Sequence, residues 1–184
     1  MIYLSKGIVC KGSTEQRLTI AHGGQEFLLV GMEAIIWQNG QFSFGETTEG
    51  WALEHMQRMG LVEFDTEDSP VSRYRILAKC ICCPGKAKGL QLPLRVAEQG
   101  IYTWLSKAGI RLTPAELVYL TEHRISPSEN LLYEGNRQAL VETIYTADTI
   151  QDNILENLME HAVSRDTVVA LLMQLLKKKR LILL

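Results

Sequence analysis

The C-terminal stretch Asn153–Leu184, NILENLMEHAVSRDTVVALLMQLLKKKRLILL, decides the fold of this chain. Two apolar patterns with helical spacing occur in it. The first consists of Ile154, Leu155, Leu158 and Met159, and the second of Val168, Leu171, Leu172, Leu175 and Leu176. Ser164 stands at the N-cap position of the second pattern, and Asp166 suits the positive end of a helix dipole. Leu181–Leu184 is apolar enough for a short strand, so the stretch predicts helix, tight turn, helix and strand.

This order of elements is typical of the helix-turn-helix part of a winged-helix domain. The run SRDTVVALLMQLLKKKRLIL resembles the recognition-helix segment of winged-helix transcription regulators, and with the preceding helix the resemblance covers Asn153–Leu184. It implies contact with double-stranded DNA through the second helix. The candidate nucleic-acid-binding residues are Ser164, Arg165, Thr167, Lys177, Lys178, Lys179 and Arg180.

Two other interpretations of this helix stay open. The basic run at Lys177–Arg180 also complements the negative end of the helix dipole, which needs no phosphate. The outward positions Val169, Ala170 and Met173 are apolar, whereas base-reading positions are usually polar. An apolar outer face indicates a protein partner or a dimer, so these three residues are candidate partner-binding residues.

The N-terminal half has a comparable order of elements, preceded by extra strands. Three short strands are expected within residues 2–30, in Ile2–Cys10 and Arg17–Val30, separated by Gly12-Ser13-Thr14 and by Gly23-Gly24. The expected elements that follow are a helix at 31–38, a small strand at 41–44, a helix at 49–58, a strand at 61–64, an acidic loop at 65–72 and a return strand at 73–82. This half therefore predicts a second winged-helix-like unit whose wing is the 65–72 loop.

A second resemblance lies in the same half. The segment GMEAIIWQNGQ, Gly31–Gln41, follows the three strands and precedes a helix and Gly60-Leu61-Val62. It is similar to the small peptide-binding winged-helix modules of peptide-modifying pathways. The resemblance implies that a peptide adds a strand to the exposed edge of the N-terminal sheet.

Together the two halves predict an α+β protein with two domains. The β-rich winged-helix-like domain is expected at residues 1–84, a linker around Pro84–Gly89 at 85–92, and a mostly helical domain at 93–184. Within the second domain, Thr113-Pro114-Ala115-Glu116 predicts a capping box with proline at the first helical position.

The sequence offers no catalytic pattern, and we interpret the chain as a non-enzymatic protein without a cofactor. It has neither the phosphate-loop spacing nor the G-x-S-x-G elbow, and its four histidines are scattered. Cys80, Cys82 and Cys83 are interpreted as small buried thiols at a strand end, where Cys80 and Cys82 would share one face. No bound metal is therefore expected.

Composition narrows the function classes further. Hydrophobic residues make up 46% of the chain, and the formal net charge is −2, with one more acidic than basic residue on each side of Leu90. This balance argues against tight nonspecific binding to nucleic acid. Lys6 interrupts the apolar start and no run reaches membrane-spanning length, so a cytoplasmic protein with reduced thiols and no membrane contact is expected.

These observations lead to two functional hypotheses. The first is a transcriptional regulator that contacts DNA through the C-terminal helix-turn-helix. The alternative is a protein- or peptide-binding adaptor that uses the apolar helix face or the edge of the N-terminal sheet. A homodimer through the C-terminal helix or strand is expected in addition, because Leu181–Leu184 would otherwise expose apolar side chains, unless they pair within the chain.

Overall fold

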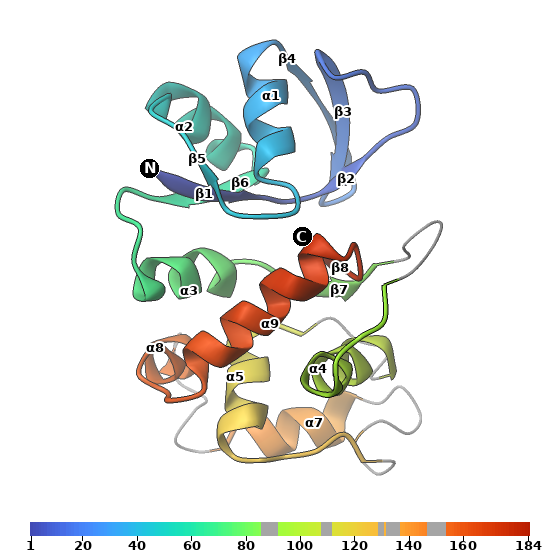
Figure 1. Ribbon diagram of the computed structural model, residues 1–184, viewed down its shortest axis with the longest axis vertical. Helices are drawn as coiled ribbons and strands as arrows, with labels where there is room; N and C mark the ends of the chain where they lie inside the picture. Colours follow the sequence, from blue (N-terminus) through green and yellow to red (C-terminus); the bar gives the residue numbers. More distant parts are fainter. Residues whose placement is uncertain (86–91, 108–111, 129–130, 132–136, 147–153) are drawn as a thin grey trace. The chain divides into compact units, whose positions relative to one another are not determined.

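The computed structural model describes residues 1–85, 92–107, 112–128, 131, 137–146 and 154–184 (Figure 1). Helices and small antiparallel sheets are both present, so the fold belongs to the α+β class. The chain divides into two units by its internal contacts. Unit 1 comprises Met1–Cys80 and Ile182–Leu184, and unit 2 comprises Ile81–Leu181. The expected linker at 85–92 falls mainly outside the described residues.

Unit 1 contains two small antiparallel sheets of three strands each. The strands are β1 (Ile2–Ser5), β2 (Ile8–Val9), β3 (Arg17–His22), β4 (Gln25–Val30), β5 (Gly45–Glu46) and β6 (Val62–Asp65). One sheet has the order β5-β1-β6 and the other β2-β3-β4. Residues 2–30 hold four strands where three were expected, because the run Ile2–Cys10 is divided between β1 and β2. Gly23 and Gly24 form the hairpin turn between β3 and β4, with φ of 58° and 80°, values that glycine adopts most readily.

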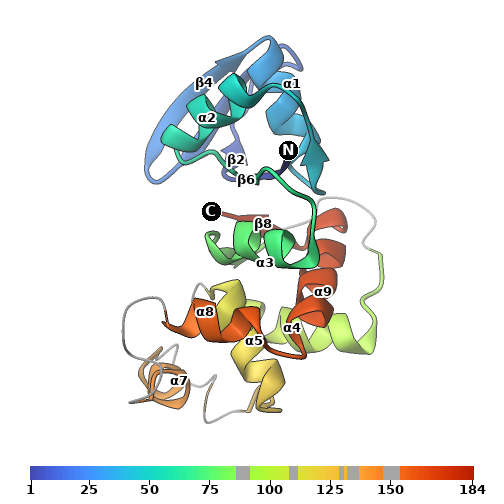
Figure 2. The same ribbon diagram turned by 90° about the vertical axis from the view of Figure 1, so that its left-hand side faces the viewer.

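Three helices complete unit 1: α1 (Met32–Asn39), α2 (Gly50–Arg58) and α3 (Pro70–Ala78). Helix α1 packs against β4 of the β2-β3-β4 sheet, whereas α2 packs against α1 and β6 (Figures 1 and 2). The core between them is built from Leu18, Ile20 and Leu29 of the sheet and from Ile36, Trp37, Leu53 and Met56 of the helices. These side chains lie on the buried faces of their elements, which follows from periods of two along the strands and about 3.6 along the helices.

The prediction of a wing hairpin in unit 1 is wrong. Residues 73–82 do not form a return strand, because Pro70–Ala78 is helix α3. Ser69 is its N-cap, accepts a hydrogen bond from the Ser72 N–H, and precedes a proline at the first helical position. The Ser-Pro pair is therefore a helix start rather than part of a hairpin loop. The small strand expected at 41–44 is also displaced, to Gly45–Glu46.

Tyr3 on β1 anchors the loop that follows α1. Its hydroxyl donates a hydrogen bond of 2.9 Å to the carbonyl oxygen of Ile36. Its ring lies directly against Gly40 and Gly45, so closely that a Cβ atom at either glycine would overlap ring atoms. Burial raises the pKa of the Tyr3 phenol to about 12, so the hydroxyl remains a donor at any ordinary pH.

Unit 2 is mostly helical in its described part. The helices are α4 (Val96–Lys107), α5 (Pro114–Glu122), α7 (Arg137–Ile144), α8 (Ile154–Glu160) and α9 (Arg165–Lys177). The capping box is confirmed, because Glu116 N–H donates to Thr113 Oγ1 and Thr113 N–H donates to Glu116 Oε2. Glu116 Oε1 also accepts a hydrogen bond from the Tyr145 hydroxyl, which ties the start of α5 to the segment after α7.

The C-terminal stretch has the predicted order, with α8 and α9 followed by strand β8 (Leu181–Leu183). β8 pairs with β7 (Cys82–Pro84), and Leu181 and Leu183 are buried within the chain. The alternative of pairing inside the chain is therefore the one observed. Leu181 and Leu183 are therefore not available to a dimer interface, whereas Ile182 and Leu184 are half-buried.

No helix in the described ranges is both long enough and apolar enough to cross a membrane.

Candidate functional site

The first residue of the predicted DNA-binding set, Ser164, is the N-cap of α9, but its side chain does not cap that helix. Its hydroxyl donates to Glu122 Oε2 at 2.5 Å, and its backbone N–H donates to the same oxygen at 2.8 Å. These hydrogen bonds hold the pKa of the Glu122 carboxyl below its usual range. The carboxylate at the end of α5 thus closes the N-terminus of α9, where the helix dipole favours negative charge.

Arg165, the residue expected nearest the bases, is held within the turn between α8 and α9. Only 15% of its side chain is exposed. Its Nε donates to Asp166 Oδ1 at 2.8 Å, and its Nη1 donates to the carbonyl oxygen of Glu160. The hydrogen bond from Arg165 is also what lowers the pKa of the Asp166 carboxyl. The guanidinium therefore stabilises the turn.

Two of the four residues in the basic run hold the end of α9 against α4. Lys178 Nζ donates to Glu98 Oε2 at 2.5 Å and to the carbonyl oxygen of Pro93 at 3.1 Å. Glu98 is fully buried, so Lys178 supplies the positive charge that a buried carboxylate needs. The Arg180 guanidinium lies 5.7 Å from the centre of the Tyr102 ring, in a cation–π contact. The sequence predicted either phosphate contact or complementation of the helix dipole for this run, and neither interpretation includes these two contacts.

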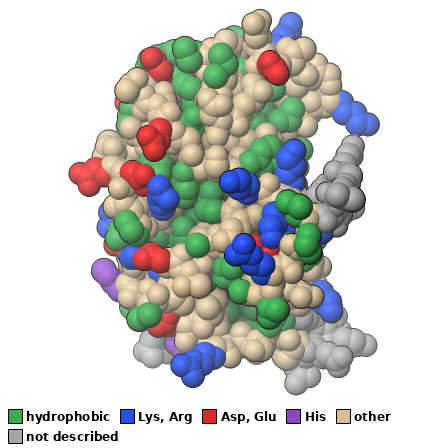
Figure 3. Space-filling model, in the orientation of Figure 1, with side chains coloured by type: hydrophobic (Ala, Val, Ile, Leu, Met, Phe, Trp, Pro, Cys, Tyr) green, Lys and Arg blue, Asp and Glu red, His purple; other side chains and the backbone are tan. Residues whose placement is uncertain are grey.

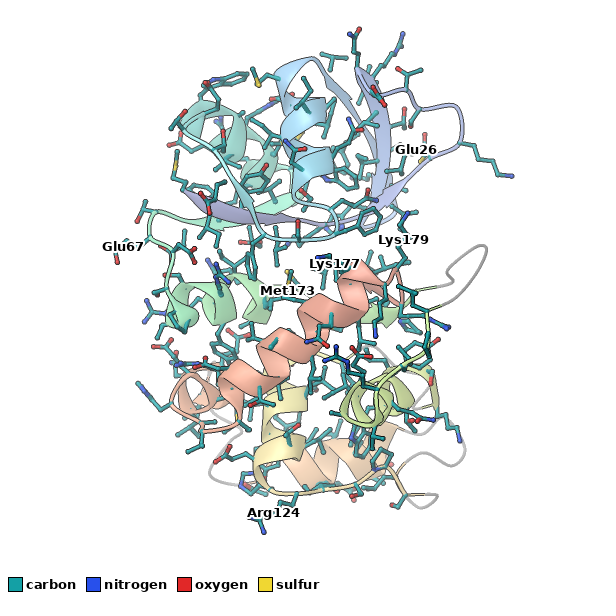
Figure 4. The ribbon with its side chains drawn as sticks, viewed as in Figure 1. Glu26, Glu67, Arg124, Met173, Lys177 and Lys179 are labelled. Carbon is teal, nitrogen blue, oxygen red and sulfur yellow. The ribbon has the colours of Figure 1, made fainter. Side chains whose placement is uncertain are left out.

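The rest of the predicted set is divided between surface and core. Thr167, Ala170, Lys177 and Lys179 are exposed, and Met173 is half-buried. Lys177 and Lys179 lie at the C-terminal end of α9, and Figure 3 shows several basic side chains on the face that displays this end (Figure 4). Val169 was expected to face outward, but it is only 8% exposed. It shares a helix face with Leu172 and Leu176, three and seven residues further on, and both are buried.

The second candidate site is the free edge of β4. β4 is the terminal strand of the β2-β3-β4 sheet, and the described residues include no strand on its other side. Cys10 N–H donates to the Thr19 carbonyl, so the backbone of Thr19 faces β2. Leu28 is the β4 partner of Thr19. In an antiparallel ladder the two opposed residues then form a non-hydrogen-bonded pair, so the backbone N–H and C=O of Leu28 point away from β3.

The same alternation applies at the neighbouring positions. Glu26 and Val30, two residues on either side of Leu28, also direct their backbone polar groups to the open side of the strand. Their side chains share the outer face of the sheet, where Leu28 is 52% exposed and Val30 is 54% exposed. Phe27 and Leu29 alternate with them and pack into the core. Within the described ranges, the edge therefore combines three backbone positions that pair with no other strand with an apolar surface.

Helix α1 extends the apolar surface beside this edge. Gly31, with φ of 59°, is the single residue between β4 and α1. Met32 and Ile35 follow, one helical turn apart, and each is 47% exposed. Met32 also lines a depression of about 480 Å³ whose other walls are Met1, Glu46, Thr47, Thr48 and Glu49. Exposed apolar side chains are thus concentrated within the eight residues from Leu28 to Ile35.

Cys80 and His55 make structural contacts, and Cys83, which was expected to be buried, is partly exposed. Cys80 was expected on a strand with Cys82, but it follows α3 and its thiol donates to the Ile76 carbonyl. Burial raises the pKa of the Cys80 thiol to about 12, so it is not a thiolate at neutral pH. His55 Nδ1 lies 2.5 Å from Glu33 Oε1 and joins α2 to α1. Within the described part of the chain, His, Cys, Asp and Glu side chains form no group of three suited to a metal ion.

Comparison of the chain with models of protein families, with curated proteins and with solved structures finds no match. The two candidate sites are therefore defined by geometry alone. Of the site residues predicted on and beside α9, only some lie together on its exposed surface. The edge residues Glu26, Leu28 and Val30 were not among the predicted site residues. Their sequence signal is the Gly23-Gly24 hairpin turn, which fixes the register of the strands on either side of it.

Proposed function

We propose that this protein is a binding protein that takes up an extended segment of a partner protein along the free edge of β4. The observation that carries the proposal is the outward backbone of Glu26, Leu28 and Val30 on a strand that, among the described residues, is paired on one side only. An added strand would form main-chain hydrogen bonds with all three residues. Peptide recognition by strand addition takes its affinity from such bonds and its specificity from alternate side chains.

The surface around the edge defines the chemistry of the segment. Side chains of the added strand that share the outer face of the sheet would meet Leu28 and Val30, both about half exposed. Those that point to the opposite face would lie on the side of α1, which leaves Met32 and Ile35 exposed. A segment with apolar residues at successive positions on both faces, and without proline, fits these requirements.

The test is selection of linear peptides of about ten residues, longer than a typical strand, from a random displayed library on the full chain. Leu28→Lys is expected to weaken binding of the selected peptides at least about tenfold, because roughly 1.5 kcal/mol of apolar contact is lost. The matched control is Val163→Lys, at a residue that is 90% exposed in the turn before α9 and far from β4 in sequence. It should leave binding unchanged.

A second measurement isolates the main-chain bonds. Methylating alternate backbone nitrogens of a selected peptide should abolish binding for one alternate set and spare it for the other, because only one set faces β4. Selection that yields no binder, or binders that tolerate Leu28→Lys as well as Val163→Lys does, would refute the proposal.

DNA binding through α9 is a second candidate function, favoured by the exposure of Thr167 in its first turn and of Lys177 and Lys179 at its end. If duplex DNA is bound, the pair of changes Lys177→Gln and Lys179→Gln should weaken affinity for all sequences. The slope of log affinity against log salt should fall by roughly 1.8, about 0.9 for each lost phosphate contact. Lys11→Gln, an exposed lysine of unit 1, is the control. Selection from random duplexes that yields none bound more tightly than about micromolar at about 0.1 M salt would dismiss this candidate.

A further inference from the structure

We infer that β4 pairs antiparallel with β4 of a second copy of this chain, around a two-fold axis at Leu28, and that this pairing competes with uptake of a partner segment. The pairing stands on the geometry of the strand. The competition rests also on the proposed function, because it requires that both occupants use the same edge.

The register of the pairing follows from which residues face outward. Hydrogen-bonded pairs across an antiparallel interface join residues whose backbone groups point to each other. A two-fold axis at Leu28 pairs Leu28 with its own counterpart and Glu26 with Val30 of the second copy, so all three outward residues are used. An axis at Phe27 or at Leu29 leaves one of the three without an outward partner within the strand.

The outer face of the combined sheet is self-complementary in this register. β3 places Thr19 beside Leu28 and Arg17 beside Val30. One row of side chains then crosses the interface in the order Thr19 and Leu28 of one copy, followed by Leu28 and Thr19 of the other. The two exposed leucines are therefore in contact. In the row on either side, Glu26 of one copy faces Val30 and then Arg17 of the other, so acidic and basic side chains of different copies share a row. Each Glu26 is thus directly opposite the apolar Val30 of the other copy, and no like charges oppose each other across the interface.

Apart from the charge of Glu26, the sequence of β4 lacks the features that usually keep an edge strand unpaired. Its six residues, QEFLLV, contain neither lysine nor proline, and its ladder with β3 is continuous from Arg17–Val30 to His22–Gln25, without a bulge. Strands with free edges are usually blunted by such residues or by bulges, because unpaired backbone groups bind other strands. Arg17 and Glu26 lie at opposite ends of the exposed face, which suits a reversed copy of the same strand better than a parallel one.

The test is site-directed disulfide formation in the full chain, with the partly exposed Cys10 and Cys83 replaced by serine and the buried Cys80 and Cys82 retained. Leu28→Cys should link to itself, because hydrogen-bonded pairs have Cα atoms about 5.5 Å apart, within disulfide range. Glu26→Cys and Val30→Cys should link when the two proteins are mixed, and neither should link to itself. Thr19→Cys is the control, since its counterpart lies three strand spacings away, about 14 Å.

The second measurement is sedimentation equilibrium at protein concentrations from about 1 μM to about 500 μM. This wide range is needed because an interface confined to one strand edge is small, and small interfaces bind weakly. The chain should dimerise, Leu28→Lys should be monomeric, and Val163→Lys should dimerise as the unaltered chain does. A chain that stays monomeric throughout this range, or cysteines at 19 and 28 that link equally well, would overturn the pairing.

Competition is tested with a peptide selected on the full chain. The peptide should lower the yield of the mixed Glu26→Cys and Val30→Cys link at least several-fold, while a scrambled peptide does not. Undiminished linking at saturating peptide overturns the competition but leaves the dimer standing. Failure to select any peptide, with linking in the stated register, refutes the proposed function and not the pairing.

Discussion

Replacing Trp37 with alanine is expected to lower the free energy of unfolding by roughly 4 kcal/mol, the largest effect of any single change considered for unit 1. Trp37 on α1 is fully buried among the side chains that join α1 to the β2-β3-β4 sheet. Its indole Nε1 also donates a hydrogen bond of 3.1 Å to the carbonyl oxygen of Lys6. The change therefore removes a large apolar volume and leaves a buried carbonyl without its donor.

The measurement is urea denaturation followed by far-ultraviolet circular dichroism. Ile35→Ala on the same helix is the matched control, because Ile35 is 47% exposed and alanine favours helix. It should cost less than about 1 kcal/mol. Trp37→Phe should fall between the two, since it keeps most of the ring but not the donor. Equal losses for Trp37→Ala and Ile35→Ala would contradict the described core.

Lys178→Met is expected to lower the free energy of unfolding by roughly 3 kcal/mol at neutral pH, because it leaves the Glu98 carboxylate buried without a counter-charge. The neighbouring Lys177 is exposed, so Lys177→Met is the control and should cost less than about 0.5 kcal/mol. The double variant Glu98→Met and Lys178→Met should recover most of the loss, because it buries no charge. A double variant less stable than Lys178→Met would contradict the assignment of Lys178 to the buried carboxylate.

The loss should also depend on pH. The hydrogen bond from Lys178 is the main cause that holds the pKa of Glu98 below its ordinary value of 4.5 in the folded chain. A depressed folded pKa contributes stability that is present above the unfolded pKa and lost as the pH falls through the folded pKa. In Lys178→Met this contribution is removed, so the variant and the unaltered chain should become more alike below about pH 4. A difference that stays constant from pH 7 down to about pH 3 would show that the ion pair is not its cause.

The elements that the sequence predicts correctly are those with strong local signals. The capping box at Thr113 and Glu116 and the apolar pattern of α9 are settled by residues within a few positions of each other. The error at 65–82 arises where local signals conflict, since Ser69-Pro70 suits both a turn and a helix start. Packing against β6 and β1 selects the helix there, and that contact is not visible in the local sequence.

The candidate sites were less predictable because each depends on distant partners. Lys178 belongs to a basic run in the sequence, yet its role is set by Glu98, 80 residues earlier. Arg165 has the right place for a recognition helix, but the Glu160 carbonyl and Asp166 occupy its donors. For β4, the residues that form strands were predictable, whereas the position of the strand at the end of its sheet required the topology.

The contact of the Tyr3 ring with Gly40 and Gly45 has an evolutionary consequence. A Cβ atom at Gly45 would overlap ring atoms of Tyr3, and one at Gly40 would overlap both the Tyr3 ring and Ser5 Oγ. A mutation at Gly45 therefore requires that Tyr3 has changed first, and a mutation at Gly40 requires room at Ser5 as well. Positions 3, 5, 40 and 45 should accordingly vary together in any lineage of this protein rather than independently.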